Sequence, residues 1–258
     1  MSTVLVEREG GVVRIRLNRP DRHNALIPET WLDLRRIGWE LVEDESVRCV
    51  VLSGSGDSFC SGIDRRALAS GDLNPFGLTG DEADRGRTEF RASDVEASQS
   101  TFQWMVDAPF VTVAAVRGFA LGAGAQLALA CDLRVVATDV TFALLEAELG
   151  LLADMTGMAT LTRIAGYPTA LDLALTSRRL TGAEMAALGI ADRLVEPDQL
   201  ETTATELAGV LASRRADSIR YTKLSIKAAA TGDLKASNEY AVQGGLRLLD
   251  GMTTAWSR

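Results

Sequence analysis

Two glycine-rich segments lie where a strand is expected to lead into a helix, and such turns can stabilise negative charge. They are Phe59–Asp64 and Gly118–Gly124. Glycine lets the backbone approach a ligand closely, and the unpaired N–H groups at a helix start favour an anion. If the two turns faced each other, they would supply a pair of donors for one developing oxyanion. The alternative is that both are ordinary packing turns, since neither has the spacing of a nucleotide-binding loop.

Carboxylates are the proton carriers that this composition favours. The chain has one histidine, His23, and 35 Asp and Glu residues, so a site built from several histidines is excluded. Cys60 beside the first turn is a conceivable nucleophile with His23, and Ser61 is a conceivable member of a hydrolase triad. Nothing in the sequence orients either pair, and the Gly-x-Ser-x-Gly elbow of such hydrolases is missing. We therefore expect acid–base chemistry by Asp or Glu side chains and no metal site.

The overall composition is that of an acidic globular protein. The 258 residues carry 27 Lys and Arg against 35 Asp and Glu, a net charge of −8, and 47% are hydrophobic. The length predicts one large domain with at most a small appendage, and the acidic balance argues against nucleic acid as a partner. Three widely spaced cysteines form no disulfide framework. The sequence shows no apolar leader and no apolar run of membrane-spanning length, so a cytoplasmic location without a membrane partner is expected.

Apolar periodicity places the two glycine turns in an α/β body that leads into helices. The predicted strands are 12–17, 49–52, 110–116, 133–136 and 141–144, and the predicted helices are 29–42 and 125–130. Alternating or continuous apolar residues indicate the strands, and one apolar face indicates the longer helix. The order of strand, glycine turn and helix therefore occurs twice.

Three further segments show patterns that bear on the organisation of the chain. Thr181–Glu184 has the pattern of a capping box that opens a short helix. Beyond about Pro197 the strand signal disappears, so we expect an α/β core over 1–196 and a helical region over 197–258. Residues 67–98 are charged and glycine-rich with no clear periodicity until their end, which predicts a mobile surface insertion.

Taken together, these motifs resemble the crotonase superfamily of enoyl-CoA hydratases and isomerases. The matching segments are Asn18–Leu26, Phe59–Asp64, Gly118–Asp132, Glu146–Gly157 and Leu180–Ala191. They keep the order of the family and span nearly the whole chain. The resemblance implies a spiral of ββα repeats and a helical C-terminal region that forms a homotrimer or a dimer of trimers. It also implies an acyl-CoA thioester as the substrate, with no separate cofactor.

The resemblance further implies where such a thioester would lie. The backbone N–H groups of Ile63 and Ala123 would bind the thioester oxygen as it becomes an enolate. The implied substrate and CoA contacts are Arg22, His23, Ala25, Ser61, Gly62, Asp64, Arg65, Gly122 and Gln126. Arginine side chains at 22, 65 and 66 are candidates for the phosphates, and the Asp64 carboxylate is also expected to cap the helix that follows it.

The catalytic acids are inferred from the same resemblance. Hydratases of this family have two glutamates, and here the first position is Gln126 while the second is Glu146. Glutamine can orient a water or a carbonyl but cannot carry a proton. The segment from Glu146 resembles that of dienoyl-CoA isomerases, which place a Glu and an Asp eight residues apart on opposite sides of the acyl chain. Glu146 and Asp154 have this spacing, and Ile63 also matches, although those isomerases usually have Asp at the position of Gln126.

Burial is expected to raise the pKa of both acids towards the working range. The apolar residues expected to bury them are Leu144, Leu145, Leu149, Leu151 and Leu152. The structural alternatives are a solvated charge at a strand end for Glu146 and an N-terminal cap of a helix over 155–164 for Asp154.

Four functions remain open from the sequence. The favoured one is double-bond isomerisation of a dienoyl-CoA in fatty-acid metabolism, with Glu146 and Asp154 as the proton carriers. The alternatives are an enoyl-CoA hydratase using Glu146, an acyl-CoA thioesterase in which Glu146 activates water, and a non-catalytic acyl-CoA binder. On the helical tail, Lys223 and Lys227 either approach a neighbouring subunit's CoA, as the tail often does in this family, or form a solvated face.

Overall fold

The computed structural model describes residues 2–66 and 92–256. Most of the predicted insertion over 67–98 lies outside the described residues. Its last part does not form an irregular loop, because residues 92–98 begin helix α3 (Ala92–Asp107). Ser98 in this helix is fully buried, so this end of the segment belongs to the packed body.

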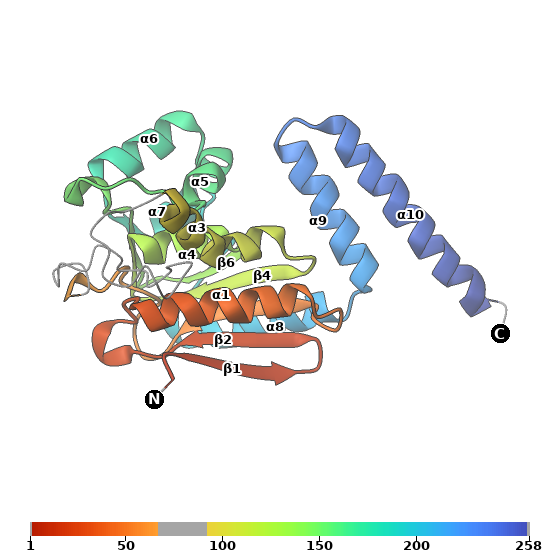
Figure 1. The fold of residues 1–258 in the computed structure, drawn as a ribbon, viewed down its shortest axis with the longest axis horizontal. Coiled ribbons are helices and arrows are strands. Elements are labelled where there is room, and N and C mark those ends of the chain that lie inside the picture. Colours follow the sequence, from red (N-terminus) through yellow and green to blue (C-terminus); the bar gives the residue numbers. More distant parts are fainter. Residues whose placement is uncertain (1, 67–91, 257–258) are drawn as a thin grey trace.

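A six-stranded sheet forms the centre of the body (Figure 1). Its strands, in spatial order, are β1 (Val4–Glu9), β2 (Val12–Leu17), β3 (Cys49–Gly54), β4 (Val111–Val116), β6 (Leu133–Ala137) and β9 (Arg193–Val195). The first two are antiparallel, and every later pair is parallel. Central parallel strands are covered on both faces, which explains why the predicted strands read as almost continuous apolar runs.

Helices cover the two faces of this sheet. One face packs against α1 (Pro28–Val42), α3 and α4 (Ala123–Ala130), and the other packs against α8 (Leu200–Ala212). Successive residues of β3 show the alternation, since Val50 and Leu52 belong to the first core and Cys49 and Val51 to the second. The sequence prediction of the helices over 29–42 and 125–130 is confirmed to within two residues.

A smaller three-stranded sheet carries the second glycine turn. Its strands are β5 (Phe119–Leu121), β7 (Thr141–Ala143) and β8 (Leu180–Thr181). The predicted turn over 118–124 therefore contains a short strand before its helix. Of the helices that follow, α7 (Gly182–Ala187) contacts this sheet, α5 (Gly157–Ala165) packs on α4, and α6 (Tyr167–Thr176) packs on α5. The predicted capping box is confirmed, because the side chains of Thr181 and Glu184 each bind the other's backbone N–H.

The C-terminal helices divide between the body and a projecting hairpin. Beyond residue 197 the described residues form helices only, as predicted. Whereas α8 packs on the sheet, α9 (Ala216–Ala230) and α10 (Leu234–Trp256) pair with each other and stand away from the body in Figure 1. A membrane-spanning helix, judged by length and hydropathy, is not found in the described ranges.

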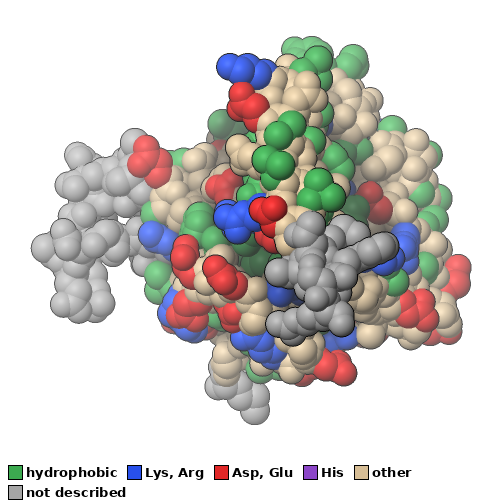
Figure 2. All heavy atoms as spheres, turned by 90° about the vertical axis from the view of Figure 1, so that its right-hand side faces the viewer, with side chains coloured by type: hydrophobic (Ala, Val, Ile, Leu, Met, Phe, Trp, Pro, Cys, Tyr) green, Lys and Arg blue, Asp and Glu red, His purple; other side chains and the backbone are tan. Residues whose placement is uncertain are grey.

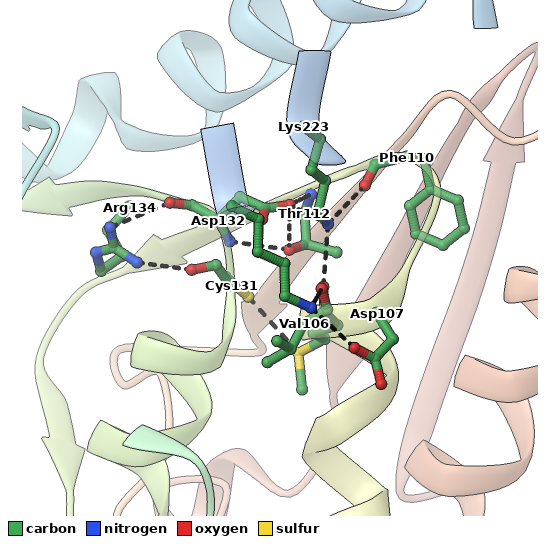
Figure 3. Close-up of polar contacts among 10 residues, drawn as sticks. Val106, Asp107, Phe110, Thr112, Cys131, Asp132, Arg134 and Lys223 are labelled. Carbon is green, nitrogen blue, oxygen red and sulfur yellow. Dashed lines mark hydrogen bonds and ion pairs between the residues drawn. The ribbon is translucent and has the colours of Figure 1, made fainter. Parts of the chain in front are cut away.

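Lys223 of α9 ties the hairpin to the body (Figure 3). Its Nζ lies 2.7 Å from Asp132 Oδ2 and donates to the carbonyls of Met105 and Phe110. The same carboxylate oxygen accepts from the N–H and the hydroxyl of Thr112. Because only 11% of the Lys223 side chain is exposed, the prediction of a solvated helix face is wrong for this residue.

Lys227, one helical turn later, binds the C-terminal end of α3. Its Nζ lies 2.9 Å from Asp107 Oδ1 and donates to the carbonyl of Val106. The last carbonyls of a helix have no partner within it and carry partial negative charge. Both lysines therefore serve as partners for the end of α3 within this chain.

Replacing Lys223 with methionine should destabilise the protein. The variant leaves the Asp132 carboxylate without its counter-charge. Loss of one partner of a buried ion pair costs about 3–5 kcal/mol, and we expect the lower end because 27% of the Asp132 side chain is exposed. We expect a lower midpoint in urea unfolding followed by circular dichroism. The matched control is Lys235→Met, whose side chain is 89% exposed and lies 3.9 Å from Glu239. Equal stability of the two variants would show that the Lys223 contacts contribute nothing.

Candidate active site

The two glycine turns lie against each other, the arrangement that the sequence left open. Cys60 pairs with Ala120 in an isolated parallel bridge. Gly62 has a φ of +92°, and a Cβ there would lie 2.7 Å from Leu121 O and 3.5 Å from Ala123 N. No other residue tolerates both that backbone conformation and that contact. Glycine at 62 therefore permits the close approach that brings the two turns together.

The backbone geometry leaves the N–H groups of Ile63 and Ala123, the two predicted oxyanion donors, without a partner in the bridge or helix to which each residue belongs. Leu26 N–H donates to Gly62 O, and Asp64 N–H donates to Leu26 O. In such a parallel bridge the N–H of the intervening residue, Ile63, points to the opposite side. Ala123 is the first residue of α4, and the first N–H groups of a helix have no partner within it. This arrangement suits two donors to one oxyanion.

Glu146 lies just beyond β7 and beside the second turn. A Cβ at Gly122 would be 3.7 Å from its Oε1, and Oε1 accepts from Gln126 Nε2 at 2.7 Å. Oε2 is buried and has no hydrogen-bond partner among the described residues. Burial raises the pKa of Glu146, and the negative charge of Asp154 adds to this effect. The alternative of a solvated charge at a strand end is therefore wrong.

Asp154 lies in the loop that leads into α5. This helix begins at Gly157 with Thr156 at its N-cap and without a side-chain cap, so the alternative that Asp154 caps the helix is wrong. Burial raises the pKa of Asp154, and its charge acts on Glu146. The Asp154 carbonyl accepts from Gln99 of α3 at 2.9 Å. The loop thus holds a second acid, with a raised pKa, near the first.

The leucines around these acids differ from the prediction. Leu144 is buried, but Leu149, Leu151 and Leu152 are exposed, the last of them by 76%. A 3-10 helix over Ala147–Leu149 and a positive φ at the following glycine turn this part of the chain outward. These three side chains therefore do not form the buried cluster that the sequence predicted around the acids.

The two segments predicted to lie along CoA adjoin each other. Ser61 N–H donates to His23 O at 2.9 Å, and Ser61 Oγ lies 3.4 Å from Arg22 O. Asn24, which sequence reasoning did not treat as a site residue, anchors this loop: it is buried, and its Nδ2 donates to Ser58 O. Its φ is +55°. The signal in the sequence that could have indicated this role is an asparagine in a polar loop, because asparagine tolerates positive φ better than most residues.

Known proteins match the chain over most of its length. The family model for enoyl-CoA hydratase/isomerase matches residues 7–244. The chain belongs to this family. A dienoyl-CoA isomerase, the peroxisomal Delta(3,5)-Delta(2,4) enzyme of Arabidopsis thaliana, is 28% identical over 239 residues, covering 92% of this chain and 82% of the relative. The short-chain-enoyl-CoA hydratase of Clostridium acetobutylicum is 29% identical over 230 residues, covering 88% and 81%.

Solved structures of this family share the fold. A Thermobifida fusca protein assigned as an enoyl-CoA hydratase, in complex with acetoacetyl-CoA, has a TM-score of 0.85 and 34% identity, covering 97% of this chain and 96% of its own. The predicted crotonase-like α/β fold is thus confirmed, and the chain is an enzyme of the enoyl-CoA hydratase/isomerase family that acts on acyl-CoA thioesters. Because relatives catalyse different reactions, similarity alone does not select one.

Asp64 has a structural partner within this family fold. Its Oδ2 lies 3.0 Å from Arg19, and its Oδ1 accepts from the N–H of Arg66. Burial opposes ionisation of this carboxyl, but the hydrogen bonds from Arg66 and Arg19 outweigh it and lower its pKa. Asp64 therefore stays ionised and fixes the end of the first glycine turn, in line with the predicted capping role.

The nucleophile alternatives are not supported by the geometry. Cys60 is fully buried, and burial raises the pKa of its thiol to about 12, whereas a cysteine nucleophile needs the thiolate. His23 Nδ1 lies 3.1 Å from Ser58 Oγ, and its ring packs edge-on against Phe119. Ser61 is bound to a backbone carbonyl instead of to the histidine. Across the described residues, no three His, Cys, Asp or Glu side chains are grouped as metal ligands.

Proposed function

We propose that this enzyme isomerises the double bonds of a dienoyl-CoA, a reaction of fatty-acid metabolism. The observation that carries the proposal is the pair of partly buried carboxyls, Glu146 and Asp154, whose pKa values are both raised by burial. Glu146 lies by the second glycine turn, and the charge of Asp154 acts on Glu146. The paired turns would present the Ile63 and Ala123 amides to the thioester oxygen. Shifting a conjugated system needs one group to remove a proton and another to return one. Two acids with raised pKa values suit that exchange near neutral pH.

The position of Glu146 beside Gly122 supports a proposal for the two ends of the reaction. Since the thioester oxygen would bind at the turns, Glu146 Oε2 would remove a proton from C2, the carbon next to the thioester. The electron pair would pass through the carbonyl to its oxygen and give a dienolate, held by the two N–H groups. The pair would then return as Asp154 protonates C6. The 3,5-diene becomes a 2,4-diene with no net gain or loss of atoms, and transfer of a proton from Glu146 back to Asp154 completes the cycle.

Incubation with a 3,5-dienoyl-CoA tests the proposal. We expect the absorbance of a conjugated 2,4-dienoyl-CoA to appear with multiple turnovers. Hydration of crotonyl-CoA without this absorbance would contradict isomerisation and support the hydratase alternative, in which Glu146 is the main acid–base group. Release of free CoA, detected with a thiol reagent, would indicate a thioesterase. Tight binding of the thioester without turnover would indicate an acyl-CoA binder.

We also propose that the α9–α10 hairpin assembles the chain into a homotrimer, alone or as a dimer of trimers. The hairpin exposes apolar side chains that include Ile226, Leu234, Val242 and Leu246, each by 60% or more. Figure 2, which faces the hairpin end of the molecule, shows apolar side chains among charged ones on this surface. Burying such side chains between copies removes apolar surface from water. Light scattering should give the mass of three or six chains, and a monomer would contradict the proposal.

A further inference from the structure

We propose that Gln126 is a positioning residue that leaves Glu146 one proton-carrying oxygen, Oε2, and fixes this carboxyl relative to the Asp154 loop. The inference rests on the proposed function, because it assigns Gln126 a part in the proton transfer. From the sequence, Gln126 marks a missing acid and a candidate substrate contact. The described contacts of its amide are instead with two protein groups.

Both polar atoms of the Gln126 amide are bound within the protein. Nε2 donates to Glu146 Oε1 at 2.7 Å, and Oε1 accepts from the N–H of Met155 at 2.7 Å. The side chain is 1% exposed. It is also tightly packed, because a Cβ at Gly157 would lie 3.2 Å from both Cα and Cγ of Gln126. The backbone of Gly157 therefore approaches Gln126 more closely than a residue with a side chain would allow.

The two partners determine which way the amide faces. A backbone N–H can only donate, so the amide atom next to Met155 must be the oxygen. The amide NH₂ group must then face Glu146, whose Oε1 can only accept from it. This orientation holds whether Glu146 is ionised or protonated, because the carbonyl oxygen of a protonated carboxyl is its better acceptor and the amide NH₂ therefore favours the proton on Oε2.

Gln126 thereby occupies Oε1 of Glu146, and Oε2 is the oxygen left for proton transfer. A proton that Glu146 gains must be carried by Oε2, the buried atom with no hydrogen-bond partner among the described residues. The hydrogen bond from Gln126 also opposes the effect of burial and lowers the pKa of Glu146, whereas the charge of Asp154 raises it. Asp154 is the charged group of the described chain that acts on this carboxyl.

The second hydrogen bond, from Met155 N–H to Gln126 Oε1, connects Gln126 to the loop that carries Asp154. Met155 directly follows Asp154, and its side chain is buried. The path from Glu146 Oε1 through the Gln126 amide to Met155 N–H therefore connects one proton carrier to the loop of the other. Gln126, in the middle of this path, comes from α4, the helix that also supplies the Ala123 amide. The amide thus fixes the Glu146 carboxyl and the loop that carries Asp154 relative to α4.

Two substitutions at this position separate the inference from a merely structural role. Gln126→Met keeps the side-chain length but removes both hydrogen bonds, so the carboxyl of Glu146 should titrate at higher pH. Gln126→Glu keeps an acceptor for Met155 but sets a second carboxyl against Glu146, so the two should share a proton and titrate in two steps. In each variant kcat for dienoyl-CoA should fall roughly tenfold or more, with KM changed less than about threefold.

The titration is measured by carbon-13 NMR of the side-chain carboxyls in the ligand-free protein, with the Glu146 signal assigned by its loss in Glu146→Gln. The matched control is Gln103→Met on α3, because the Gln103 amide binds Asp107 outside the site. The control should leave titration and kcat unchanged. If Glu146 titrates in Gln126→Met as in the wild type, the inference is wrong even where kcat falls, because the fall then reflects structure alone. If Gln126→Met does not fold, the two-step titration of Gln126→Glu decides.

Failure of the inference and failure of the proposed function give different results. Wild-type enzyme that turns over no dienoyl-CoA would refute the isomerase proposal. The NMR titration of the ligand-free protein would still test the effect of Gln126 on Glu146. Normal wild-type turnover with an unmoved titration of Glu146 in Gln126→Met would refute the positioning role alone.

Discussion

Glu146→Gln should lower kcat for dienoyl-CoA isomerisation by about 10³-fold, with KM changed less than about threefold. The variant keeps the shape of the side chain and an oxygen that can accept from Gln126, but it has no basic oxygen at the Oε2 position. Since the proton at C2 is then left without an acceptor, the loss falls on the chemical step. Steady-state measurement of the 2,4-dienoyl absorbance gives kcat and KM for the variant.

The matched control for this substitution lies two residues away. Glu148 is on the same 3-10 turn, its side chain is 47% exposed, and it lies 3.6 Å from Arg179. Glu148→Gln makes the same chemical change outside the pair, so its kcat should stay within about twofold of the wild type, since an exposed pair contributes little. An active Glu146→Gln enzyme would remove Glu146 from the mechanism.

Loss of folding does not account for the expected fall, because Glu146→Gln should be more stable than the wild type at neutral pH. Burial raises the folded-state pKa of Glu146 above its unfolded value. Below the unfolded pKa of about 4.3 both states are protonated and nothing is lost. As the pH rises through the folded pKa, ionisation costs the wild type stability that the neutral glutamine keeps. The stability gain in urea unfolding should therefore be present at pH 7 and absent at pH 3.

Asp154→Asn should lower kcat for dienoyl-CoA isomerisation to a similar extent, by about 10²- to 10³-fold. The reason is different, because here the dienolate forms at the turns but no acid delivers the proton at the far end. Hydration of crotonyl-CoA needs chemistry near the thioester only, so any hydratase activity should be unaffected. Measuring both reactions on the same preparation tests the assignment of the two ends.

The control for this variant is Asp172→Asn on α6, whose side chain is 48% exposed and pairs with Arg178 at 3.4 Å. It should keep full isomerase activity. Isomerisation that survives in Asp154→Asn would remove the second proton carrier. A wild-type enzyme that only hydrates, with Asp154→Asn equally active, would establish the hydratase alternative.

The elements that the sequence predicted well are those with burial on both faces. The strand at 49–52 reads as a continuous apolar run because β3 lies in the middle of a parallel sheet between two helical layers. The edge strand β1 gave no such signal, since four of its six residues are exposed. Its pairing with β2 depends on backbone hydrogen bonds that leave no apolar pattern.

Side-chain roles on the tail and around the acids were less predictable. Lys223 has a helical spacing that fits a solvated face, yet its ammonium binds Asp132, 91 residues earlier in the chain. Leu149, Leu151 and Leu152 have the composition of a buried cluster, but the turn that follows β7 exposes them. In both cases the environment of a side chain depends on segments that local periodicity does not describe.

By itself, the sequence determined the family, the two glycine turns and the pair of acids, because those features are local motifs of residue type and spacing. Only the tertiary structure decided that the turns face each other and that Gln126 joins Glu146 to the Asp154 loop. That amide links residues 20 and 29 positions away from it. Hydrogen bonds between such distant segments depend on how α4, β7 and α5 pack. Both of them meet at Gln126, the position where hydratases of this family have a glutamate.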